Sequence, residues 1–159
     1  MNSPLTARLE RTLFYAYLAL LVWAPLPFAS NRVWGGALLA LLVGLVLVSW
    51  LVLYLTGRVR ISAGVWHHGR LPLALLVVVQ LWVFVQIQFL PGPLVAWLSP
   101  QAFAWHLPDG WLSLSLDREY TSYYLLRGCA FTAGFFLTLV LVNSHDRLRT
   151  LLQVLVFSG

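Results

Sequence analysis

The chain has 159 residues, of which 60% are hydrophobic and 9% are charged, against about 25% charged residues in an average soluble domain. So little polar surface cannot coat a water-soluble globule of this size, and lipid is the expected main solvent. The formal net charge of +5 is the difference between ten arginines and five acidic residues. The arginines form no consecutive basic block, so the sequence does not favour a nucleic-acid-binding protein.

Four long apolar runs contain Arg127 as their one charge, and a helix needs roughly 20 apolar residues to cross a bilayer core. The runs cover residues 13–28, 33–55, 71–90 and 123–142. A fifth run begins at residue 151 and is unfinished at Gly159, which predicts the amino-terminal piece of a longer protein. The expected fold is all-α: a polytopic transmembrane helical protein with four spans plus the start of a fifth, in one transmembrane region with an external loop at residues 91–122.

The arginines fall mostly on alternate breaks between the runs, and this pattern predicts the topology. One side of the membrane receives seven of them: Arg8, Arg11, Arg58, Arg60, Arg70, Arg147 and Arg149. The other side receives three: Arg32, Arg118 and Arg127. Because cytoplasmic segments carry the excess of positive charge, the amino terminus is expected in the cytoplasm, with residues 1–11 as a short lead-in.

The first run is barely long enough for a span and carries Pro25 and Pro27 near its outer end. Proline removes a backbone donor and restricts the preceding residue, so the helix is expected to break there. Residues 25–32 then either line a cavity or simply end the helix at the membrane interface. A cleaved signal peptide is rejected because further spans follow and a retained first helix is the simpler account.

The second and third runs carry features that are expected to pack helices together. Gly36, Ala40 and Gly44 recur every four residues and form a small-residue face, which favours close approach of helices in lipid. Gln80 lies near the middle of the third run, where an amide that faced lipid would be unsatisfied, so it is expected to face another helix. An interhelical hydrogen bond and a substrate contact are both open for Gln80.

The external loop is rich in aromatic residues, mainly tryptophan, and in proline, and it is therefore expected to lie along the membrane surface. Within it, residues 111–117 alternate leucine on one side with serine or aspartate on the other, which predicts a short extended stretch. Asp117 is expected to cap the fourth helix, and Glu119 suits the positive end of the helix dipole.

The sequence contains no nucleophile elbow, glycine-rich phosphate loop or metal-spaced cysteine pair. The predicted topology divides the histidines between the inner loop (His67, His68), the outer loop (His106) and the segment after the fourth span (His145). No metal, haem or other cofactor is therefore expected. The single cysteine, Cys129, has no intramolecular disulfide partner and is expected to be a small packing residue.

Three arginines on the outer side are candidates for binding the phosphate of an anionic lipid: Arg127, Arg32 and Arg118. The planar guanidinium group suits phosphate oxygens. Arg127 is the sharpest candidate, because an ionisable residue near membrane depth marks a functional site by default. The alternative is that Arg127 extends to the outer interface or pairs with Asp117 or Glu119.

Three segments resemble the amino-terminal part of bacterial O-antigen ligase and polymerase family proteins. They are residues 24–32 (APLPFASNR), residues 115–117 (SLD) and residues 141–149 (LVNSHDRLR). The resemblance covers nearly the whole chain. It implies a larger parent protein in the bacterial inner membrane that moves a glycan from an undecaprenyl-pyrophosphate carrier to an acceptor at the periplasmic face, as in lipopolysaccharide biosynthesis, without a nucleotide sugar or a metal.

The essential arginine and histidine of that family lie mainly in a large periplasmic loop far downstream, so no catalytic residue is carried over to this chain. The chain is expected to supply helix packing and part of an outer cavity wall, with membrane lipids and undecaprenyl-pyrophosphate glycan as partners and no nucleic acid. The alternative is a small non-enzymatic membrane subunit that packs in a larger complex. A transporter is a weaker option, because the spans lack paired intramembrane charges.

Overall fold

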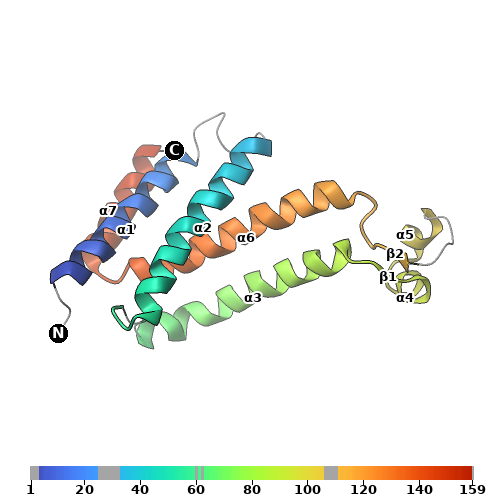
Figure 1. Ribbon diagram of the computed structural model, residues 1–159, viewed down its shortest axis with the longest axis horizontal. Helices are drawn as coiled ribbons and strands as arrows, with labels where there is room; N and C mark the ends of the chain where they lie inside the picture. The colour runs from blue at the N-terminus through green and yellow to red at the C-terminus, as the bar shows by residue number, and fades with distance from the viewer. Residues whose placement is uncertain (1–3, 25–32, 60, 62, 106–110, 159) are drawn as a thin grey trace.

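The computed structural model describes residues 4–24, 33–59, 61, 63–105 and 111–158, and it is built mainly from long helices (Figure 1). These are α1 (Pro4–Trp23), α2 (Val33–Leu55), α3 (Ala63–Ile87), α6 (Arg118–Leu141) and α7 (His145–Ser158). Between α3 and α6 lie β1 (Leu90–Pro91), α4 (Gly92–Leu98), α5 (Pro100–Trp105) and β2 (Trp111–Leu112). The two short strands pair antiparallel. The prediction of an all-α fold is confirmed.

Among the described residues, three helices are long and apolar enough to cross a membrane. They are residues Trp34–Leu55 of α2, Gly69–Ile87 of α3 and Arg118–Leu141 of α6. The 20-residue helix α1 is less apolar, because Arg8, Glu10 and Arg11 all lie within it. The chain is therefore a helical protein with three helices that are apolar enough to span a membrane.

Two helices begin well before the apolar runs that predicted them. In the predicted lead-in at residues 1–11 the chain is already helical from Pro4, where α1 begins. That helix ends at Trp23, ahead of the two prolines, and residues 25–32 lie outside the described part of the chain. Similarly α3 begins at Ala63 rather than residue 71. An apolar run marks where lipid begins, whereas backbone hydrogen bonds extend a helix into water.

The later boundaries differ from the predictions in the same way. α6 begins at Arg118, so the segment between the third and fourth long helices ends earlier than the predicted residue 122. α7 begins at His145 rather than residue 151, and its first turns are polar. His67 lies in the first turns of α3 and not in an inner loop.

The second run was predicted with the observed bounds, Val33–Leu55, and the structure shows what ends this helix. Gly57 has a φ of +69°, a left-handed conformation that glycine adopts without steric cost. The amide of Gly57 donates to the carbonyl of Tyr54, and the amide of Arg58 donates to the carbonyl of Leu53, both at 2.9 Å. These two bonds form a Schellman motif, which satisfies the last carbonyls and stops α2.

One apolar core joins α1, α2, α6 and α7. From α2 it receives a stripe with alternating spacings of four and three residues: Leu39, Val43, Val46, Trp50 and Leu53. The rings of Trp50 and Phe136 of α6 pack in a T-shaped arrangement, with their centroids 5.2 Å apart. Tyr17 of α1 ties this core to α6, because its hydroxyl donates to the Gly134 carbonyl at 2.8 Å and lies 2.6 Å from the Thr138 hydroxyl. The buried face of α2 is thus lined by large side chains.

The helix α3 lies outside that core and packs beside α6 in an antiparallel pair (Figure 1). Each helix supplies one glycine at the seam. A Cβ at Gly69 of α3 would lie 2.6 Å from Leu139 Cδ1 of α6, and a Cβ at Gly128 of α6 would lie 2.7 Å from Gln80 Nε2 of α3. The two glycines therefore make room for the opposing side chains. The prediction that Gln80 faces another helix is confirmed.

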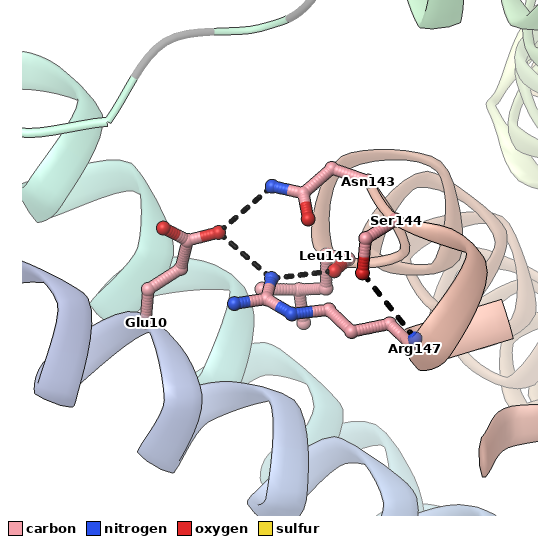
Figure 2. A network of polar contacts seen from close by, with 5 residues as sticks. All are labelled: Glu10, Leu141, Asn143, Ser144 and Arg147. Carbon is pink, nitrogen blue, oxygen red and sulfur yellow. Dashed lines mark hydrogen bonds and ion pairs between the residues drawn. The ribbon is translucent and has the colours of Figure 1, made fainter.

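A polar network joins the start of α1 to the connection between α6 and α7 (Figure 2). Arg147 Nη1 donates to Glu10 Oε1 and to the carbonyl of Leu141, both at 2.8 Å. The side-chain amide of Asn143 donates to the same Glu10 oxygen at 3.0 Å. The Ser144 hydroxyl accepts from the backbone amide of Arg147 at 3.3 Å. The network thus holds one end of α6 and the beginning of α7 against α1.

Two regions at the helix ends matter for the site, and we call them the arginine-rich end and the cap (Figure 1). At the arginine-rich end α1, α3 and α7 begin and α2 and α6 end, and it holds Arg8, Arg11, Arg58, Arg70, Arg147 and Arg149. The cap consists of residues 90–105 and 111–116 at the far end of α3 and α6, with a small core of Val95, Ala102 and Leu112.

The extended stretch predicted at residues 111–117 is shorter and less regular than expected. Only Trp111–Leu112 pairs as a strand. The expected division into a leucine side and a polar side is wrong, because Ser113 is buried while Leu116 is exposed. Ser113 avoids an unsatisfied hydroxyl by donating to the carbonyl of Ser115 at 2.7 Å. The chain bends there instead of continuing as a strand.

Candidate lipid-phosphate site on α6

The helix that carries the candidate arginines begins with a side-chain cap. Asp117 Oδ1 accepts from the amide of Tyr120 at 2.9 Å, and Glu119 lies in the first turn. Both predictions for these acids are confirmed. The Ser115 hydroxyl lies 2.7 Å from the Thr121 hydroxyl and donates to the carbonyl of Asp117 at 2.8 Å. These bonds fix where α6 leaves the cap and therefore the orientation of its first turns.

Arg118 closes the far end of the seam between α3 and α6. Its Nε donates to the carbonyl of Ile87 at 2.9 Å, and its guanidinium carbon lies 4.0 Å from the centre of the Phe89 ring. The Ile87 carbonyl is at the carboxyl end of α3, where carbonyls lack helical partners and favour a cation. The structure thus gives Arg118 a role in joining two helices.

Arg127 lies nine residues beyond Arg118, roughly 13 Å along the helix axis at 1.5 Å per residue. Its side chain is half-buried, and its guanidinium carbon lies 5.6 Å from the centre of the Phe131 ring. In the described part of the chain it forms no ion pair with Asp117, Glu119 or any other carboxylate. A cation at this depth with only an aromatic ring as partner is costly in hydrocarbon.

The structure does not gather the predicted arginines into one cluster. Nine residues correspond to about two and a half helical turns, so Arg118 and Arg127 project from opposite sides of α6. Arg32 lies outside the described residues. Arg127 is therefore the centre of the candidate site.

Two tyrosines complete the surface around Arg127, and sequence reasoning missed them. Tyr120, Tyr124, Arg127 and Phe131 recur at spacings of four, three and four residues, which places them on one face of a helix. The hydroxyls of Tyr120 and Tyr124 lie 2.9 Å apart, and both rings are exposed. We call these four residues the α6 stripe. The helical spacing of the stripe is visible in the sequence, but the predicted external loop, residues 91–122, includes Tyr120.

The small-residue face predicted on α2 makes one close contact. A Cβ at Gly36 would lie 2.6 Å from Tyr123 Oη of α6, whereas a Cβ at Gly44 would meet nothing within 4 Å. Ala40 between them is half-buried. Glycine therefore allows close approach to α6 near the start of α2, and that approach does not extend to Gly44.

A groove of about 470 Å³ runs between α2, α3 and α6. Its lining is almost wholly apolar, with polar atoms from Gln80, Cys129 and Thr132. The Thr132 hydroxyl donates to the carbonyl of Gly128 at 2.9 Å, so its proton is already used within α6. The groove can therefore accept an apolar chain or a helix but offers little to a polar ligand.

The described residues show no group of three or more histidine, cysteine, aspartate or glutamate side chains placed to hold a metal. His67 lies in α3 and His145 begins α7, whereas the side chain of His68 and all of His106 lie outside the described part.

Comparisons with known protein families, with curated proteins and with solved structures find no match to this chain. Its function must be argued from the arrangement of its own residues.

Proposed function

We propose that this chain is the amino-terminal membrane portion of a bacterial glycan transferase that resembles O-antigen ligases and polymerases. In this proposal the α6 stripe binds the phosphate of an undecaprenyl-linked glycan at the periplasmic face of the inner membrane. The chain contributes to carrier binding, and no residue in it is assigned a catalytic role.

The observation that carries the proposal is the environment of Arg127. Its guanidinium is half-buried on a helix apolar enough to span a membrane, and no described carboxylate neutralises it. A phosphate group would supply the missing charge, and guanidinium–phosphate hydrogen bonds are among the strongest that proteins make. The hydroxyls of Tyr120 and Tyr124 lie along the same face. Because one of them donates to the other, one hydroxyl proton is left to donate to a phosphate or sugar oxygen.

The charge distribution supports the proposed orientation. Six described arginines gather at the arginine-rich end, and Arg127 lies in the half of α6 nearer the cap. With the arginine-rich end in the cytoplasm, as the positive-inside rule favours, the α6 stripe faces the periplasmic leaflet. We propose that α1 and the run that begins in α7 also lie in the membrane, which gives four spans and part of a fifth.

Binding of undecaprenyl phosphate to the full chain in lipid nanodiscs tests this proposal. Removal of a charged hydrogen-bond donor costs about 1.5–3 kcal/mol, so Arg127→Gln should weaken binding roughly 10-fold to 100-fold. Arg149→Gln is the matched control, because Arg149 is exposed at the opposite end of the molecule. Equal affinity of the wild-type chain and Arg127→Gln would refute the site. Equal competition by phosphatidylglycerol would indicate a general anionic-lipid site instead.

The groove between α2, α3 and α6 favours a second candidate function, that of a non-enzymatic subunit of a larger membrane complex. Within the apolar segment Gly69–Ile87 of α3, Gly69 is the one buried residue, and a helix of a partner would cover the exposed apolar side chains. Purification in mild detergent distinguishes the two proposals. A chain that remains with a stoichiometric membrane partner supports the subunit, whereas a monomer contradicts it.

A further inference from the structure

The cap has an unusual surface for a segment that lies outside the membrane-spanning helices. Its described residues, 90–105 and 111–116, include no charged side chain. Three large rings nevertheless point outward, with Trp97 78% exposed, Trp105 80% exposed and Trp111 66% exposed. A surface in bulk water would normally carry charged residues, and exposed apolar patches of this kind mark interaction sites.

The exposure of these rings does not come from a lack of folded structure. Val95, Ala102 and Leu112 form a buried core inside the cap, and β1 pairs with β2 across its base. The amide of Ser99 donates to the carbonyl of Val95 at 2.8 Å and the carbonyl of Ser99 accepts from the amide of Phe103 at 3.0 Å, so this residue links α4 to α5. The cap buries small and aliphatic side chains and presents its tryptophans outward.

The cap is held close to the membrane at both of its ends. The apolar segment of α3 ends at Ile87 and that of α6 begins at Arg118, so at most three residues separate the cap from a spanning segment. The 19-residue segment of α3 is about 28 Å long, close to the roughly 30 Å thickness of a hydrocarbon core. The cap therefore begins where the hydrocarbon ends, in the layer of lipid headgroups.

From these observations we propose that the cap is a membrane-interface anchor whose Trp97, Trp105 and Trp111 insert into the headgroup layer around the ends of α3 and α6. An indole combines an apolar ring with a hydrogen-bond donor, and both are satisfied at this depth. The anchor fixes how deeply the α3–α6 pair sits in the bilayer. It does not depend on the proposed glycan-carrier site.

The polar side chains of the cap argue for lipid rather than sugar as the partner of these rings. A sugar site places several hydrogen-bonding groups around an aromatic surface. In the cap, Ser99 accepts from the amide of Ala102, and Ser113 and Ser115 both donate to carbonyls of the same turn. Apart from the tryptophans, Gln101 is the one polar side chain of the described cap that remains for a ligand. One amide is too little to recognise a sugar.

Tryptophan fluorescence of the full chain in phosphatidylcholine vesicles tests the anchor. Emission is compared between plain lipid and lipid brominated in the upper acyl chain, for the wild type and for Trp97→Phe, Trp105→Phe and Trp111→Phe. The difference between the wild type and each variant isolates the emission of one ring. Trp50→Phe is the matched control, because Trp50 is 2% exposed within the helical core.

The anchor predicts that bromolipid quenches the emission of all three cap rings and leaves that of Trp50 nearly unchanged. Absence of bromolipid quenching at the cap rings would overturn the proposal. If aqueous iodide then quenches these rings, they lie in water; if iodide does not quench them, they are buried against another partner. Phenylalanine at these exposed positions removes few contacts, and circular dichroism of each variant verifies the helical fold.

Discussion

The ion pair between Glu10 and Arg147 is expected to stabilise the association of α1 with α6 and α7. Its side chains are 13% and 22% exposed, respectively. This places it between surface pairs, worth about 0–1 kcal/mol, and buried pairs, in which loss of one partner costs about 3–5 kcal/mol. Each of Glu10→Ala and Arg147→Ala should therefore cost roughly 1–3 kcal/mol. At about 2–4 °C per kcal/mol for a chain of this size, the melting temperature should fall by roughly 2–12 °C.

Thermal unfolding in detergent of the two single variants and the double variant measures this contribution. The Glu10 carboxylate accepts from both Arg147 and Asn143, so the double variant should be less destabilised than the sum of the single variants, by about 0.5–3 kcal/mol. Arg149→Ala is the control, because this exposed neighbour on α7 should change stability by less than about 0.5 kcal/mol. Strict additivity of Glu10→Ala and Arg147→Ala would refute the energetic role of the pair.

Three further predictions concern helix packing, of which two are measured by the same unfolding assay and one by the rate of a cysteine crosslink. Gly36→Leu should destabilise the chain by about 1–3 kcal/mol because the new leucine side chain would collide with Tyr123. Gly44→Leu should not destabilise the chain, because the space around Gly44 is open. Equal effects of the two variants would contradict the contact between Gly36 and Tyr123. Gly128→Leu should displace Gln80 and loosen α3 from α6, and a cysteine crosslink between these helices should form more slowly; an unchanged rate would count against the seam. Tyr17→Phe should cost about 0.5–1.5 kcal/mol through loss of the bond to the Gly134 carbonyl, and a neutral result would show that this bond contributes nothing.

The bounds that hydropathy predicts for α2 and the capping residue predicted for α6 both agree with the structure, which has a local signal at each position. Gly57 stops α2 with a left-handed turn, and Asp117 caps the first turn of α6. Hydropathy alone placed the other boundaries, and it reports where side chains prefer lipid. It therefore missed the first turns of α1 and α3, whose polar residues continue the same backbone hydrogen bonds.

The contacts that hold the helices together were harder to predict. Gly69 and Gly128 are single glycines with no periodic neighbour, so their role appears only when α3 and α6 lie side by side. The bond between Glu10 and Arg147 spans 137 residues of chain. At the candidate site, Arg127 was predicted from its charge alone, whereas its two tyrosines required the observed start of α6.

In the proposed topology, the arginine-rich end and the cap lie on opposite sides of the membrane, with the cap and the α6 stripe on the periplasmic side. Single cysteines at Arg149 and Gln101 in a Cys129→Ser chain test it, because both positions are exposed. A membrane-impermeant maleimide applied to right-side-out vesicles should label position 101 at once and position 149 only after permeabilisation. Labelling of position 149 from outside, or of both positions from one side, would contradict the topology and the site built on it.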